Sequence, residues 1–178
     1  MLKRKNNDDS ALALKIASLR EAPLDIPRPY IEAANDSSLY YKKRRLSDFG
    51  YVVEETRVRT LKIKTGMPEG LLIANKYFTV YVLDAGHILV VIEPGYAWDG
   101  PSGPVFHTKT WMDGSLFHDL GYQLMRMGIL PRNCKNDFDR AMQQICIEKG
   151  MWKFRAWYSY QGVHYFGHKY TKSDLLAA

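Results

Sequence analysis

The fold is decided by the stretch Ser115-Leu116-Phe117-His118-Asp119-Leu120-Gly121-Tyr122, which lies at the centre of a long predicted helix. At 3.6 residues per turn, four aliphatic and thioether side chains fall on one side of this helix, with Phe117 flanking them. These are Leu116, Leu120, Leu124 and Met127. The opposite side is also largely apolar and carries Trp111, Ser115, His118, Tyr122 and Met125. Because a helix that is apolar nearly all round is normally buried, we expect this one to lie in the core.

Three polar side chains on this helix need partners if the helix is buried. They are His118, Asp119 at the edge of the same side, and Tyr122. A buried polar group without a hydrogen bond is costly, so each of them should contact another polar group. Two interpretations follow. The three groups are satisfied core polar residues, or they belong to a functional site in which His118 titrates.

The segment before the helix predicts β-structure. Between residues 48 and 94, β-branched and aromatic runs alternate with turn sequences rich in Gly, Pro, Asn and Asp. The runs are residues 51–53, 58–63, 71–73, 77–83 and 88–92. Hairpin-length links between them predict a small, mainly antiparallel sheet.

A loop rich in glycine and proline follows, over residues 95–109. Its first part reads Gly-Tyr-Ala-Trp-Asp-Gly-Pro-Ser-Gly-Pro, which forbids regular structure and fixes an unusual backbone path. Such a loop can aim several carbonyl oxygens at one point, as Ca²⁺ requires, and Asp99 would add a carboxylate. The alternative is a stiff connector between sheet and helices.

Two more helices are predicted after the central one. The first runs from Asn133 to Lys149 and stops at Gly150, with Asp139 at the edge of its apolar stripe. A carboxylate there can reach a neighbouring helix and hold one imidazole nitrogen, or it can be an exposed residue. The last segment, residues 151–170, is dense in aromatic and basic residues. We expect its aromatic rings to pack in the core, with a subunit interface as an addition, although such interleaving also occurs at nucleic-acid and membrane interfaces.

Together these segments predict an α+β protein with an extended N-terminal arm, a small sheet and a three-helix C-terminal half. A single domain covers residues 48–170, with the sheet in 48–94, the loop in 95–109 and the helices in 110–170. Residues 1–47 form a predicted basic arm with one short helix, and residues 171–178 form a tail.

The net charge of +6 is concentrated in the arm. Lys42, Lys43, Arg44 and Arg45 are its candidate interaction residues, docking on an acidic neighbour. The two cysteines, Cys134 and Cys146, have neither a disulfide nor a metal spacing. No apolar segment resembles a signal peptide or a transmembrane span, so we expect a soluble chain.

Between Ile92 and Gly167 the chain follows one order of motifs: a Gly-aromatic-x-x-Asp-x-x-Ser-x-Pro loop, a His-Asp-x-x-Tyr helix, an Arg-to-Asp helix and an aromatic helix ending in Phe-Gly. The residues are Gly95, Tyr96, Asp99, Ser102, Pro104, His118, Asp119, Tyr122, Arg132, Asp139, Met142, Gly150, Phe166 and Gly167. In this order the segment resembles a family of unknown function found in tailed bacteriophages and prophages, DUF thirteen-fifty-three. The resemblance covers somewhat under half of the chain. It implies a bacteriophage origin and a place in the virion, after synthesis in the host cytoplasm, but no established activity.

A more distant resemblance concerns chemistry. The order of loop, His-Asp-x-x-Tyr helix and later Asp is similar to phospholipases A2, including the parvovirus capsid type. It implies His118 as the base, Asp139 as its orienting residue and Tyr122 as a support. It also implies a Ca²⁺ ion held by Asp119 and by loop groups. Those groups would be Asp99 and the carbonyls of Gly100, Pro101 or Gly103. The disulfides of the secreted enzymes are absent, and Trp98-Asp99 has no equivalent there.

Two functions of different classes follow. The first is a virion structural component, in a tail, neck or baseplate, that assembles through its arm with copies of itself and with other virion proteins. The second is a virion-associated or lysis-related hydrolase that attacks host envelope lipid. An occluded His118 favours the first, and an open cleft with a bound cation favours the second. Nucleic-acid binding by the arm is a third alternative, with a steep salt dependence as its signature.

Overall fold

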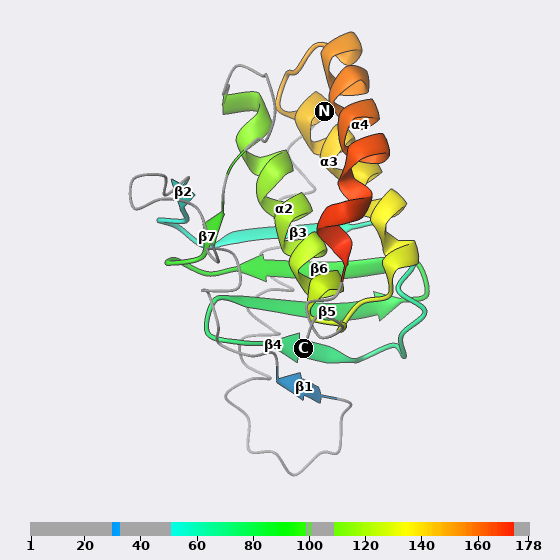
Figure 1. Ribbon diagram of the computed structural model, residues 1–178. Helices are drawn as coiled ribbons and strands as arrows, with labels where there is room; N and C mark the ends of the chain where they lie inside the picture. The colour runs from blue at the N-terminus through cyan, green and yellow to red at the C-terminus, as the bar shows by residue number, and fades with distance from the viewer. Residues whose placement is uncertain (1–29, 33–50, 99, 101–108, 173–178) are drawn as a thin grey trace. The chain divides into compact units, whose positions relative to one another are not determined.

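The computed structural model describes residues 30–32, 51–98, 100 and 109–172, which fall into two compact units (Figure 1). The first unit contains residues 30–32 and 52–96, and the second contains residues 51, 97, 98, 100 and 109–172. Strands make up the first unit and helices most of the second, so the predicted α+β class is confirmed. The predicted domain boundaries stay predictions.

The first unit is built on a five-stranded sheet with the strand order β1-β4-β5-β6-β3. Its strands are β1 (Tyr30–Glu32), β3 (Arg57–Leu61), β4 (Leu72–Ala74), β5 (Phe78–Asp84) and β6 (His87–Ile92). All neighbours in this order are antiparallel except β1, which runs parallel to β4. Strands β2 (Tyr51–Val52) and β7 (Ala97–Trp98) pair separately. The mainly antiparallel sheet is therefore as predicted, but strand β1 lies in the segment that was expected to be an arm.

Successive side chains of a strand point to opposite faces of the sheet, which explains one buried face here. The register places Phe78 opposite Ile92, Val80 opposite Val90 and Val82 opposite Ile88, so these side chains share a face. All six are buried. Their β-branched and aromatic side chains suit a pleated surface covered on that side, which is why the runs at 77–83 and 88–92 predicted strands correctly.

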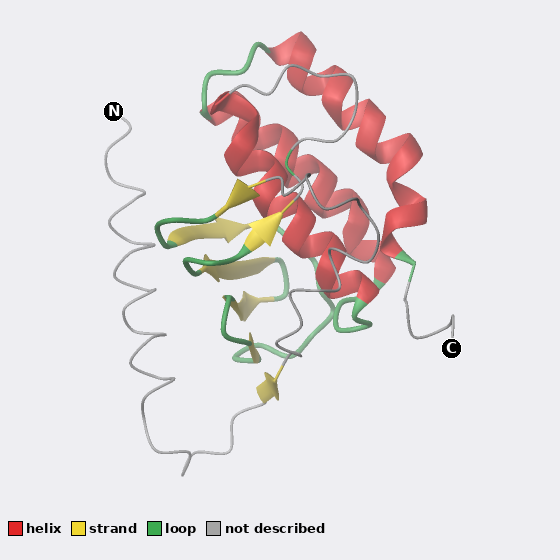
Figure 2. Cartoon of the chain, turned by 60° about the vertical axis from the view of Figure 1, so that its left-hand side comes forward, coloured by secondary structure: helices red, strands yellow, loops and turns green. Residues whose placement is uncertain are grey.

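Three helices form the second unit (Figure 2). They are α2 (Lys109–Arg126), α3 (Lys135–Glu148) and α4 (Lys153–Phe166). Two short 3₁₀ segments, η2 (Arg132–Cys134) and η3 (Gly167–Thr171), precede α3 and follow α4. Helix α3 packs against both α2 and α4. The predicted three-helix C-terminal half is confirmed, and α2 is buried on both predicted sides.

Side chains from all three helices share one hydrophobic cluster. Its buried members are Trp111 of α2, Met142 and Cys146 of α3, Met151 of the link between α3 and α4, and Ala156 of α4. Cys134 and Cys146 are both buried thiols, in keeping with the expectation that they form no disulfide. Burial raises the pKa of Cys134 to about 11 and that of Cys146 to about 12, so both thiols stay protonated at neutral pH.

Residues 151–170 do not pack as expected. Among their large aromatic side chains, those between 48% and 74% exposed are Trp152, Phe154, Trp157, Tyr158, Tyr165, Phe166 and Tyr170. Only Ala156 and Ser159 of α4 are fully buried, because small residues at this spacing let α4 approach α3 closely. The prediction that this segment fills the core is therefore wrong for most of its rings.

The exposed rings of α4 form a stripe. Phe154, Trp157, Tyr158 and Tyr165 recur at helical spacing on the side opposite Ala156 and Ser159, and we call these four residues the aromatic stripe. In the part of the chain that the structure describes, no helix has the length and apolar character needed to cross a membrane.

Helices α2 and α3 approach closely at two glycines of α2. A Cβ atom added at Gly114 would lie 2.6 Å from Cys146 Sγ, and one added at Gly121 would overlap the ring of Phe138. The two glycines are seven residues apart and so lie on one face of α2. This contact places the α2 residues between them, His118 included, beside α3.

Gly121→Ala should destabilise the chain by about 1–3 kcal/mol, because the added methyl group overpacks against Phe138. In an exposed helix interior the same change stabilises by up to about 1 kcal/mol. The matched control is Gly162→Ala in α4, since a Cβ there meets no atom within 4 Å. Urea unfolding should move the two variants in opposite directions. Equal stability of both variants would show that the close approach at Gly121 does not limit packing.

Candidate functional site

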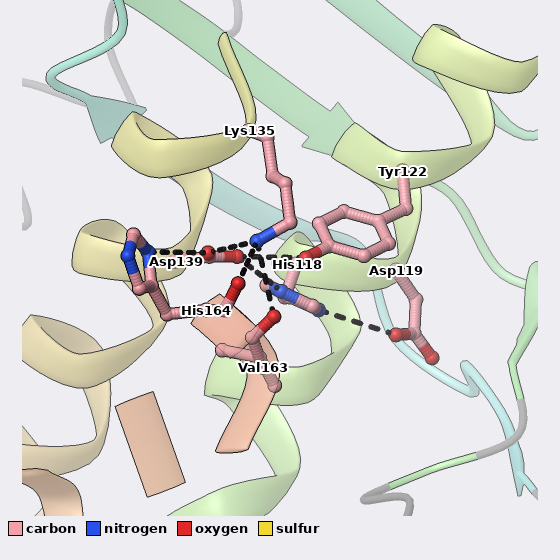
Figure 3. Close-up of polar contacts among 7 residues, drawn as sticks. All are labelled: His118, Asp119, Tyr122, Lys135, Asp139, Val163 and His164. Carbon is pink, nitrogen blue, oxygen red and sulfur yellow. Dashed lines mark hydrogen bonds and ion pairs between the residues drawn. The ribbon is translucent and has the colours of Figure 1, made fainter. Parts of the chain in front are cut away.

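The candidate site is a cluster of polar side chains buried among the three helices (Figure 3). His118, which is 6% exposed, stands between two carboxylates. Its Nε2 lies 2.9 Å from Asp139 Oδ1, and its Nδ1 lies 3.6 Å from Asp119 Oδ1. The first distance is a hydrogen bond and the second an ion pair without one. Both ring nitrogens of His118 therefore face a negative charge.

Asp139 has no exposed surface, and the cluster satisfies both of its oxygens. Oδ1 accepts hydrogen bonds from His118 Nε2 and from the Tyr122 hydroxyl, each at 2.9 Å. Oδ2 accepts a hydrogen bond from Lys135 Nζ at 2.7 Å. A buried carboxylate is tolerated only when paired and hydrogen-bonded in this way. The sequence prediction that Asp139 reaches a histidine on the neighbouring helix agrees with this geometry.

Lys135 is also buried, and its ammonium group has three oxygen acceptors. Besides Asp139 Oδ2, these are the main-chain carbonyls of Val163 at 3.0 Å and His164 at 3.1 Å. An ammonium group has three donors, so every one of them is used. The two carbonyls belong to the last turn of α4, where helix carbonyls lack some of their intrahelical partners. The Val163 carbonyl also accepts the N–H of Gly167. Lys135 therefore ties α3 to the end of α4.

Local sequence explains how these groups meet. His118 and Tyr122 are four residues apart on α2, so they share a face, and their ring centroids are 4.1 Å apart. Lys135 and Asp139 are four residues apart on α3. Gly167, just after α4, completes the fit, because a Cβ there would collide with the Tyr122 hydroxyl. The Phe-Gly ending of the last helix thus has a packing reason.

Electrostatics favour the charged form of His118. Burial is the largest single influence and lowers its pKa, but the polar contacts and negative charges of Asp119 and Asp139 outweigh burial. The net result is a pKa raised above the ordinary 6.5. Burial likewise raises the pKa of Asp139, but the hydrogen bonds and charges of His118 and Lys135 reverse that effect and lower it. Burial, and then Asp139, raise the pKa of Tyr122, so it remains a neutral donor.

His164 borders the cluster. Its Nδ1 lies 3.9 Å from Asp139 Oδ2 and has no hydrogen-bond partner among the described residues. Its ring stacks on Tyr160 with centroids 5.3 Å apart. The nearer cation, Lys135, already occupies Asp139 Oδ2, so His164 is a neighbour of the network rather than a member.

The Gly/Pro loop is described only at its beginning. Trp98 Nε1 donates a hydrogen bond to Ser115 Oγ at 3.2 Å, which anchors the start of the loop on α2. Gly100 is buried with a positive φ of 77°, and the Tyr51 ring is so close that no other residue fits. The other predicted calcium ligands of the loop, Asp99, Pro101 and Gly103, lie outside the described residues.

Two further expectations concern ions and charges. Within residues 51–98, 100 and 110–172, no group of three or more His, Cys, Asp or Glu side chains could hold a metal ion. The basic residues Lys42, Lys43, Arg44 and Arg45 lie outside the described part of the chain. The calcium site and the arm interaction therefore stay predictions.

Sequence reasoning missed Lys135, the residue that neutralises Asp139. A signal was present, because Lys135 precedes Asp139 by one helical turn and so lies on the same buried face. A lysine is almost never fully buried unless it is paired. The apolar stripe of α3 alone could not show that Lys135 is both buried and paired. The carbonyls of Val163 and His164 carried no sequence signal at all.

Compared with family models, curated proteins and solved structures, the chain shows no match. The resemblances to the bacteriophage family and to phospholipases A2 accordingly stay predictions, and the site is interpreted from its own geometry.

That geometry suits a structural network better than a catalytic base. A general base must be neutral near the working pH and must present a free nitrogen to the proton it removes. His118 has a raised pKa, both of its nitrogens face carboxylates, and the residue is nearly excluded from solvent. His118 and Lys135 instead both contact Asp139, and the carboxylates favour the charged form of the ring.

The pH dependence of stability should carry the signature of His118. A raised folded-state pKa gives a stabilising contribution that is full below the unfolded value of 6.5 and is lost as pH rises through the folded value. The stability advantage of wild type over His118→Gln should therefore shrink as pH increases beyond about 6.5. Urea unfolding of both proteins at a series of pH values below and above 6.5 measures this difference in stability. An advantage that grows with pH would mean that His118 is neutral in the fold.

Proposed function

We propose that the chain is a structural component of a bacteriophage particle, in a tail, neck or baseplate, which works by binding neighbours rather than by turnover. The observation that carries the proposal is the aromatic stripe of α4. Soluble proteins rarely expose contiguous large apolar side chains unless a partner covers them. Trp and Tyr are also the residues that most often dominate the energy of binding surfaces.

The buried polar cluster supports the same proposal. All donors of Lys135 and both oxygens of Asp139 are used inside the fold, and the cluster joins α2, α3 and the end of α4. A network satisfied in this way makes the helical unit rigid, which suits a helix that must present a binding surface. The proposal also assigns assembly to the basic arm of residues 1–47, through Lys42, Lys43, Arg44 and Arg45.

The proposal predicts that the chain is a stoichiometric part of the particle. Particles purified from cells that carry the gene should contain it in a fixed ratio to the other structural proteins, measured by quantitative mass spectrometry. A chain in which Lys42, Lys43, Arg44 and Arg45 are changed to Ser, which keeps strand β1, should be depleted from particles. Particles that contain no full-length chain, although the cells express it, would contradict the proposal.

A hydrolase is the second candidate, and one observation favours it. The hydrogen bond between His118 Nε2 and Asp139 Oδ1, at 2.9 Å, is the pairing by which a carboxylate orients a catalytic imidazole. Its test is hydrolysis of envelope-lipid vesicles with calcium and with chelator, by wild type beside His118→Ala. We expect no turnover by either protein. Calcium-dependent turnover that is lost in the variant would replace the structural proposal with an enzymatic one.

A further inference from the structure

The aromatic stripe has an unusual composition for an exposed helix face. Phe154, Trp157, Tyr158 and Tyr165 are all aromatic, and the stripe contains no aliphatic side chain. Helix α4 has 14 residues and is therefore about 21 Å long. Exposed Trp152 lies at its start and exposed Phe166 at its end. Rings thus occupy the outer side of the helix in its first two turns and again in its last turn, with Gln161 between them.

The charged residues of α4 and its flanking segments have one sign. From residue 149 to residue 172 the sequence contains no Asp or Glu, while its basic residues are Lys149, Lys153, Arg155, Lys169 and Lys172. Lys149 pairs with Asp113 at 2.6 Å, and Arg155 lies over the Trp111 ring. The exposed Lys153, Lys169 and Lys172 border the stripe and its C-terminal end. A partner of this surface should therefore be anionic.

Anionic lipid fits both features. Trp and Tyr rings are enriched where membranes meet water, because one end of each ring is apolar and the other is polar. Helices that lie in this interface combine Trp and Phe on one side with Lys or Arg at its borders, and anionic headgroups attract the basic residues. The stripe with its flanking lysines has this arrangement.

Two other partners fit less well. A second copy of the same surface would bring lysines together without a carboxylate to meet them. Single-stranded nucleic acid stacks its bases on open ring faces. Here Trp152 packs on Phe154 and Phe154 on Trp157, with centroids 5.6 and 5.8 Å apart, so the rings contact one another instead.

We infer that the aromatic stripe and its flanking lysines form a docking surface for an anionic lipid bilayer, with α4 lying in the headgroup region. The inference rests on the proposed function, which makes the stripe a binding surface. It adds the chemical class of the neighbour that covers it.

Vesicle binding of the full-length chain tests the inference. Vesicles of phosphatidylcholine with phosphatidylglycerol, and of phosphatidylcholine alone, would be compared by flotation and by tryptophan emission. The emission is informative because Trp98 and Trp111 are buried, whereas Trp152 and Trp157 are exposed. We expect binding to the anionic vesicles with a blue shift in emission, and at least about fivefold weaker binding to neutral ones.

Two variants identify the surface. Phe154→Ser with Trp157→Ser should weaken vesicle binding about tenfold or more, while the control Val52→Ser, an exposed apolar residue of β2, leaves it unchanged.

Lys153→Glu with Lys169→Glu should weaken binding about fivefold or more. Its control is Lys62→Glu with Lys76→Glu, which changes net charge equally. The charge variants keep every ring, so they test the surface even if the serine variant unfolds.

Several outcomes would overturn the inference. These are absence of binding to anionic vesicles, loss of binding equally in the control variants, or tighter binding of single-stranded oligonucleotide by the same residues. Self-association through the stripe, seen by sedimentation, would assign the surface to a second copy instead. Such results leave the chain's presence in particles untouched, so failure of this inference differs from failure of the proposed function.

Discussion

The helical unit depends on one buried carboxylate. Asp139 is fully removed from solvent, and an unpaired charge in such a place would cost several kcal/mol. It is tolerated because His118 and Tyr122 approach from α2 and Lys135 approaches from one turn earlier on α3. Lys135 in turn needs the terminal carbonyls of α4. Each of the three helices thus supplies hydrogen-bonding groups to the cluster. The cluster forms only when α2, α3 and the end of α4 are all in place. The close approach at Gly114 and Gly121 is what brings the α2 groups within reach.

The same contacts decide how His118 should be interpreted. A histidine held by one carboxylate has a free nitrogen and can accept a proton. Here a second carboxylate, Asp119, faces the other nitrogen, and the balance of effects raises the pKa of the ring. Lys135 Nζ donates to Asp139 and to two main-chain carbonyls, so a second cationic group lies beside the same carboxylate. The cluster therefore forms an internal network of charged and hydrogen-bonded groups, which supports the structural proposal.

Much of the fold could be predicted from the sequence, since periodicity reports burial directly. The two-sided apolar pattern around His118 predicted a buried α2, and the β-branched runs predicted β3 to β6. The contact between Asp139 and a histidine of the neighbouring helix was one of two alternatives, because a carboxylate at the edge of an apolar stripe can reach a neighbouring helix or remain exposed. Lys135 was missed because a lysine on a buried face looks like an exposed one until its partners are known. The rings of α4 were misassigned because helical periodicity gives a stripe but not the direction in which it points. Only the packing of Ala156 and Ser159 against α3 decides that. Strand β1 has no local signal strong enough to distinguish it from an extended arm.

The central claim is that the buried charges hold the three helices together. The most direct test compares the free energies of unfolding of Asp139→Asn, Lys135→Met and the double variant with that of wild type. If the buried charges hold the three helices together, Asp139→Asn leaves Lys135 without a counter-charge and His118 with Asp119 alone, and should cost about 3–5 kcal/mol in urea unfolding. Asp119→Asn, at a partly exposed position, should cost less than about 1 kcal/mol. The double variant should be markedly more stable than the sum of the single losses predicts, because it removes both charges of the pair. Additive losses, or an Asp139→Asn protein as stable as Asp119→Asn, would contradict the account.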